Sequence, residues 1–190
     1  QYEAEAGTRW SYHNAPYTLL DEVLESATGE NRNQLTRKYL HETIGMDGVW
    51  FQTGFNVPYF STARSMARFG LLIQQKGSWN GTQLFGDQEY FQAMTTPSQD
   101  LNEAYGYLWW LNAGETHRLP RTQFLFPSRL IPSAPAEVFA ALGKNDQKIY
   151  VWPSEELVFI RMGDSAEESA LAASSFDSQL WEKIMDLSCE

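Results

Sequence analysis

Cysteine is almost absent from this 190-residue chain, in which Cys189, next to the C-terminus, is the only one. One thiol cannot form an intrachain disulfide or a cysteine-rich metal site, so neither holds the fold together. The sequence also lacks an uninterrupted run of about 18 apolar residues, which excludes a membrane span in this chain.

Positive charge is scarce as well, because 14 Lys and Arg stand against 24 Asp and Glu, giving a formal net charge of −10. A negative surface repels phosphate, so nucleic acid and anionic membranes are not expected partners. We interpret the acidity as a contribution to solubility. No signal peptide is visible, but Gln1 is not a natural start, so this absence says nothing about export.

Several functional motifs are missing. The three histidines, His13, His41 and His117, lie far apart and form no H-x-x-x-H or H-x-x-E-H pattern, so no metal site is expected. There is no G-x-G-x-x-G or G-x-x-x-x-G-K loop for phosphates and no G-x-S-x-G elbow. We therefore expect neither a metal nor an organic cofactor.

Apolar residues are plentiful: 43% of the chain is hydrophobic and seven residues are Trp, enough for a real core. Helical spacing dominates the first half, where Pro16 suits the first turn of a helix and Gly29 its C-terminal stop. The predicted helices cover residues 16–27, 34–43, 62–75 and 88–94, and Ser61 and Asp87 are the expected N-caps. Leu20 and Val23 follow helical spacing, and Tyr39, Ala63 and Leu71 are among the residues expected to face inward.

Strand patterns follow in the second half, over residues 105–111, 138–142, 148–152 and 157–162, with a hairpin connection at residues 153–156. The proline-rich stretch 116–135 reads as an irregular loop, and residues 167–187 as an amphipathic helix with Phe176, Leu180, Ile184 and Leu187 on its apolar stripe. Helices followed by antiparallel strands predict an α/β fold, α+β in strand order: a helical lobe (1–103), then sheet strands and a terminal helix (104–190) of the same domain. A single helix over such a sheet leaves one face bare, which hints at a missing segment.

An ordered series of motifs runs along the chain: Tyr12-His13-Asn14, Phe60–Leu72, Trp79-Asn80-Gly81, Tyr105–Trp110, Ala141–Pro153 and Leu157–Gly163. Together they resemble the serine β-lactamase and penicillin-binding-protein family. Tyr12-His13-Asn14 resembles the Y-x-N element of class C β-lactamases and related esterases. The motifs cover nearly the whole chain in order, so the resemblance implies a β-lactamase-like fold.

The resemblance also implies acyl transfer through a serine that lies in an S-x-x-K element, one helical turn before its lysine. No serine here has Lys three positions later; Ser61 and Ser65 are followed by Arg64 and Arg68. We therefore expect the nucleophile upstream of Gln1, so that this chain is the C-terminal portion of the fold and is inactive alone. The missing N-terminal part of the same fold is then an expected partner.

Site roles follow from the resemblance at matching positions. Tyr12 matches the catalytic tyrosine, although it could instead be a packed tyrosine hydrogen-bonded in a turn. Asn14 matches the substrate-binding asparagine, or else caps the following helix.

The family's K-T-G triplet corresponds to Ala141-Leu142-Gly143, without its lysine and hydroxyl, which counts against efficient β-lactam hydrolysis. Gly143 permits close approach of a substrate, and the backbone N–H of Lys144 would be an oxyanion donor, while its side chain is simply solvated. The aromatic set Tyr107, Trp109 and Trp110 is expected to pack in the core.

The leading hypothesis is a serine acyl hydrolase acting on a small ester, amide or peptide-like substrate, and the resemblance favours an exported bacterial protein. The alternative is a non-catalytic binding or scaffold protein that kept the fold. Folding of these residues alone, as a natural cleavage product, is a third and less favoured possibility.

Overall fold

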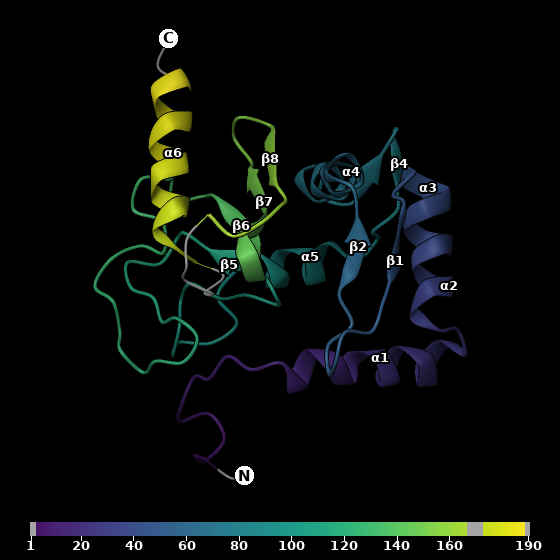
Figure 1. The fold of residues 1–190 in the computed structure, drawn as a ribbon, viewed down its shortest axis with the longest axis horizontal. Helices are drawn as coiled ribbons and strands as arrows, with labels where there is room; N and C mark the ends of the chain where they lie inside the picture. The colour runs from purple at the N-terminus through teal and green to yellow at the C-terminus, as the bar shows by residue number, and fades with distance from the viewer. Residues whose placement is uncertain (1–2, 167–172, 189–190) are drawn as a thin grey trace.

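The computed structural model describes residues 3–166 and 173–188 (Figure 1). The first half is largely helical, with two small hairpins, and the second half holds the main sheet. The elements are α1 (Ala15–Thr28), α2 (Arg32–Thr36), the π-helix η1 (Arg37–His41), α3 (Glu42–Ile44), β1 (Gly48–Trp50), β2 (Tyr59–Ser61), α4 (Ala63–Gln74), β3 (Ser78–Trp79), β4 (Thr82–Gln83), α5 (Gln88–Met94), β5 (Trp110–Leu111), β6 (Phe139–Gly143), the 3₁₀ turn η2 (Lys144–Asp146), β7 (Gln147–Trp152), β8 (Leu157–Arg161) and α6 (Ser175–Ser188).

The predicted α/β class is confirmed, with helices preceding an antiparallel sheet in the order β5-β6-β7-β8. Tyr150 of β7 pairs with Ala140 of β6 on one side and with Phe159 of β8 on the other. Because successive side chains of a strand point to opposite faces, this register decides which residues meet which helix. The division between residues 103 and 104 stays a prediction.

Both faces of the sheet are covered, so the expectation of a bare face is wrong. The structure places α4 on one side of β7 and β8 and α6 on the other (Figure 1). Trp181 of α6 is fully buried, with its ring 5.6 Å from those of Tyr150 and Trp152. The strand pattern had counted only one covering helix because α4 precedes the sheet by a long stretch of chain.

The predicted helix boundaries mostly hold, except for the helix predicted over residues 167–187: residues 167–172 lie outside the described part of the chain, and α6 begins only at Ser175. Gly29 ends α1 in the left-handed conformation (φ 70°), and the Asp87 carboxylate caps α5 by accepting from the Tyr90 N–H at 2.8 Å. The N-cap of α4 is Thr62 rather than Ser61, since the Thr62 hydroxyl accepts from the Ser65 N–H at 3.2 Å. A cap is therefore one residue later than predicted.

Several inward positions were wrong. Tyr39 is exposed, because the π-helical turn shifts the phase of the helix that was predicted as continuous. Leu71 and Ala63 are also exposed, whereas Ile73 of the same helix is buried. Leu187 of α6 lies in solvent.

The predicted strand at 105–111 is a tight turn followed by the two-residue β5, with a bridge between Tyr105 and Trp110. Two hairpins of the first half were not predicted. The Asn80-Gly81 turn between β3 and β4 has φ of 47° and 76°, the left-handed values that Asn-Gly favours in a hairpin, so its dipeptide was a usable signal.

The stretch 116–135 forms no helix or strand among the described elements, as predicted. The buried Asn112 amide anchors it by donating to the Ile131 and Ala134 carbonyls, both at 3.0 Å.

Gly70 explains why α4 lies so close to the sheet. A Cβ at this position would be 2.5 Å from Val158 Cγ1 and 3.1 Å from Ile149 Cγ2, well inside van der Waals contact. Only glycine lets the helix pack at this distance, so Gly70 determines how closely α4 lies against the sheet.

We predict that Gly70→Ala destabilises the protein, because the clash with Val158 outweighs the better helix propensity of alanine. The free energy of unfolding should fall by about 1–2 kcal/mol in urea titrations. Gly86→Ala is the matched control, since nothing lies within 4 Å of its added methyl. It should change stability by less than about 0.5 kcal/mol. Equal stabilities of both variants would mean that α4 does not approach the sheet as described.

Candidate active site

Tyr12 lies two residues before Asn14, at the start of α1, and packs against the first strand of the main sheet. Its ring stacks on Trp110 of β5 (centroids 5.9 Å apart, planes at 24°) and meets Tyr105 edge-on at 5.9 Å. The side chain is half-buried, and its hydroxyl makes no hydrogen bond to a described residue. The alternative of a tyrosine hydrogen-bonded in a turn is therefore not what these residues form.

Burial raises the pKa of the Tyr12 phenol above its usual 10, and the neighbouring Tyr17 raises it further. This direction opposes phenolate formation. A proton-transfer role therefore needs a cation close to the hydroxyl, because an opposite charge is what stabilises the ionised form.

Asn14 occupies the N-cap of α1, but its side chain does not cap the helix. Its Nδ2 instead donates to Asn56 Oδ1 at 3.0 Å, and the Tyr17 hydroxyl donates to the same oxygen at 3.3 Å. The capping alternative is thus not adopted by the side chain. Asn14 is exposed and connects the start of α1 to the loop between β1 and β2.

Gly143 is the last residue of β6 and pairs with Gln147 across the β6–β7 hairpin. An added Cβ would be 3.2 Å from Gln147 Cβ, so the close approach expected of this glycine is made to the partner strand. Lys144 comes next, with an exposed side chain and a backbone N–H one residue beyond the last pair of the ladder. Asn145 and Asp146 then turn the chain with φ of 58° and 56°.

One edge of β6 is open where it reaches Gly143. β5 pairs only with Phe139 and Ala140, so no described strand pairs with residues 141–143 on that side. Tyr12 stacks on Trp110, the partner of Ala140, and Gly143 lies three residues further along, roughly 10 Å at 3.3 Å per residue. The structure thus places Tyr12 beside Trp110, at the paired end of β6, and Lys144 just beyond the other end, without a described contact between them.

The aromatic set packs mainly in the core, as predicted: Trp109 and Trp110 are buried. Tyr107 is the exception and is exposed, with its ring 5.7 Å from that of Tyr90.

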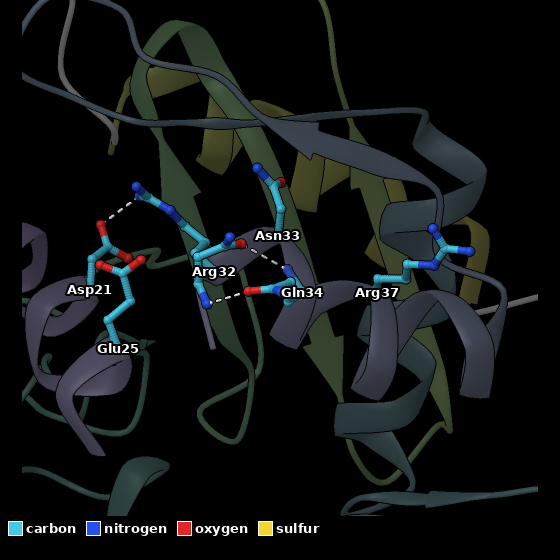
Figure 2. A pocket seen from close by; sticks show the side chains of 7 residues that line it. Asp21, Glu25, Arg32, Asn33, Gln34 and Arg37 are labelled. Carbon is cyan, nitrogen blue, oxygen red and sulfur yellow. Dashed lines mark hydrogen bonds and ion pairs between the residues drawn. The ribbon is translucent and has the colours of Figure 1, made fainter. Parts of the chain in front are cut away.

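The surface of the described residues has two hollows near the N-terminal segment. One, of about 420 Å³, lies between α1 and α2, where Asp21 and Arg32 point toward each other and form an ion pair of 2.5 Å (Figure 2). It holds none of the predicted site residues. The other, of about 580 Å³, is lined by Trp10 and Ser11, beside Tyr12, and by residues 99–101.

A buried ionic cluster near the same hairpin escaped the sequence analysis. Lys148 has its ammonium 3.1 Å from Asp146 and 3.0 Å from Asp177. Lys148 is separated from Tyr150 and Trp152 by even numbers of residues along β7, so it faces the core on the same side of the strand as they do. This spacing was a usable signal of its burial. Elsewhere in the described residues no group of three or more His, Cys, Asp or Glu could hold a metal ion, and no helix is long and apolar enough to cross a membrane.

Comparisons with known proteins place these features in a family. A family model described as β-lactamase matches residues 1–162. A protein from Bacillus anthracis that is provisionally named as a 6-aminohexanoate-dimer hydrolase superposes with a TM-score of 0.69 at 20% identity, covering 100% of this chain and 45% of that one. A provisionally named β-lactamase from Bacteroides dorei DSM 17855 gives 0.65 at 15% identity, covering 95% and 59%. The curated proteins contain no match. The chain thus spans about half the length of the solved structures that it matches.

The raised pKa of Tyr12 gives a direct prediction for this chain by itself. With ¹³Cζ-labelled tyrosine, the NMR signal that disappears in Tyr12→Phe should titrate above pH 10, the usual tyrosine value, because burial disfavours phenolate. N-acetyl-tyrosinamide, titrated alongside, gives the unperturbed value. A midpoint below that of the free amide would contradict the described environment of the ring.

Proposed function

The chain belongs to the β-lactamase family, and from this premise we propose that the complete protein is a serine hydrolase that cleaves an ester or amide bond through an acyl-enzyme. A serine oxygen bonds to the substrate carbonyl carbon and gives up its proton, and the leaving group departs with a proton. Water then attacks the acyl-enzyme, which releases the acid and restores the serine.

The observation that carries this proposal is that the two candidate catalytic groups flank β6, whose edge is open beyond Ala140. Tyr12 stacks on Trp110, the partner of Ala140 at the paired end of the strand, and the Lys144 N–H follows Gly143 at the other end. In this proposal the substrate carbonyl and the attacking serine lie between them. Tyr12 would then carry the proton, and the Lys144 N–H would hold the oxyanion.

In this proposal the serine and its lysine come from outside these 190 residues, since no S-x-x-K occurs among them. A lysine ammonium beside Tyr12 would also remove the difficulty of its raised pKa, because a nearby positive charge favours phenolate. One added segment would thus supply both the serine nucleophile and the lysine that lets Tyr12 act as a base.

An exposed apolar surface supports a further contribution from the rest of the fold. No residue of α1 is buried, and Leu19 and Val23 on this helix are 55% and 59% exposed; across the adjacent hairpin Phe51 and Phe60 are 61% and 52% exposed and Phe55 is fully exposed. Apolar patches of this kind mark contact sites. We propose that the remaining part of the β-lactamase-like fold covers this surface, in line with the half-length match to solved structures.

The substrate proposed is a small ester or a short linear amide rather than a β-lactam. Ala141-Leu142-Gly143 offers neither the lysine nor the hydroxyl with which the resembled family holds a β-lactam carboxylate. The name of the Bacillus anthracis protein, which refers to an amide-linked dimer, agrees with this direction. Asn14, exposed beside Tyr12, would donate to the substrate amide. A binding or scaffold protein without chemistry is the rival, and it predicts no turnover of esters, amides or β-lactams by the complete protein.

The oxyanion assignment is tested by two substitutions at Lys144, with kcat measured on a chromogenic ester. Lys144→Ala should keep most activity, because the side chain is exposed and only the backbone donates. Lys144→Pro removes the N–H and should lower kcat by about 10²-fold to 10³-fold.

Circular dichroism and thermal melting must show that the proline variant is folded, since proline can disturb a sheet. An alanine variant as impaired as a folded proline variant would assign the function to the side chain instead. Two fully active variants would mean that the oxyanion donor lies elsewhere.

A further inference from the structure

The turn that carries Lys144 is tied to the interior by a carboxylate. Asp146 has no exposed side-chain surface, nor does Lys148, whose Nζ lies 3.1 Å from Asp146 Oδ1. Lys148 also lies 3.0 Å from Asp177 Oδ2, in the first turn of α6. A buried ion pair contributes little net stability compared with apolar packing, so stability alone does not explain why this ion pair is present.

The Asp146 carboxylate is held from several sides. It accepts hydrogen bonds from the Ala166 N–H at 2.9 Å and from the hydroxyls of Ser165 and Ser174 at 3.2 and 2.9 Å. Burial alone would raise the pKa of Asp146, but the donors from Ala166, Ser174 and Lys148 outweigh it and hold that pKa below its usual value. The group is therefore a carboxylate, which accepts every one of these bonds.

The backbone of the same turn is clamped as well. The Arg161 guanidinium donates to the carbonyls of Asn145 and Asp146 at 3.2 and 3.3 Å, and Gln147 Nε2 donates to the Asn145 carbonyl at 2.7 Å. Asn145 and Asp146 both have positive φ, a strained backbone conformation that persists only where the surroundings enforce it. The contacts on this turn supply that enforcement.

We propose that Asp146 is a positioning residue: its buried ion pair with Lys148 fixes the β6–β7 turn and so holds the Lys144 backbone N–H, two residues earlier, in place at the end of β6. This inference rests on the proposed function. Lys148 pairs with Asp177 of α6 as well as with Asp146. Through these two ion pairs α6 supports the turn that carries the Lys144 N–H. A donor displaced by about 1 Å can lose 10²-fold in rate, which is the reason for such a rigid turn.

A purely structural role is the competing explanation, in which the cluster only fastens α6 to the sheet. The structural and the positioning role differ in the quantity that a substitution of Asp146 would lower. A structural role lowers the fraction of folded enzyme, whereas a positioning role lowers the turnover of each folded active site and the affinity for a tetrahedral analogue of the oxyanion intermediate.

The test uses the complete protein with Asp146→Asn, and with Asp164→Asn as the matched control, since Asp164 is exposed in the segment just before Ser165. Active sites are counted with a fluorophosphonate, kcat and KM are measured on p-nitrophenyl butyrate, and inhibition by phenylboronic acid is titrated. Asp146→Asn should lower kcat per titrated site by about 10-fold to 10²-fold with little change in KM. Its affinity for the boronate should fall by a similar factor, and Asp164→Asn should match the wild type in all three.

If Asp146→Asn fails to fold because Lys148 loses one of its two carboxylate partners, Asp146→Asn combined with Lys148→Met and Asp177→Asn removes all three buried charges. This triple variant should fold and still show the loss of kcat. A folded variant with wild-type kcat and boronate affinity would overturn the positioning role while leaving the proposed function intact. A wild-type protein that neither reacts with the fluorophosphonate nor hydrolyses the ester would overturn the proposed function itself, and the inference with it.

Discussion

The antiparallel pairing of β6 with β7 is the constraint on which the rest of the structure depends. It brings Tyr150 opposite Ala140 and ends at Gly143 and Gln147. A shift of one residue would exchange the two faces of β7, so that Lys148 would leave its carboxylates and Ile149 would leave α4. The register therefore fixes the packing of both covering helices and the position of the turn that carries Lys144.

Local signals in the sequence were sufficient for α1 and for the three long strands of the main sheet. Pro16 and Gly29 delimit α1, and the stretches around β6, β7 and β8 were recognisable as strands within one or two residues. Contacts between distant segments were not recognisable in this way. The closeness of α4 to the sheet depends on the absence of a side chain at Gly70, and the burial of Lys148 depends on Asp177. Neither pairing has a signature in a single sequence.

The same contrast between what the sequence indicated and what only the structure shows applies to the candidate site. Tyr12, Asn14, Gly143 and Lys144 were named from a resemblance that the family match confirms at the level of the family, while their roles stay proposals. The structure adds physical content to them. Tyr12 has a raised pKa and needs an external cation, and Lys144 sits on a turn braced from behind the sheet. In this account the chain supplies an oxyanion donor and a proton carrier, and the nucleophile is supplied by the rest of the protein.

The most direct measurement of that account is the position of a covalent adduct. The complete protein is treated with a fluorophosphonate, digested and analysed by peptide mass spectrometry. The account predicts one adduct per chain, on a serine outside residues 1–190 that has lysine three positions later. An adduct on any serine within residues 1–190, or ester hydrolysis by a protein that forms no adduct, would contradict it.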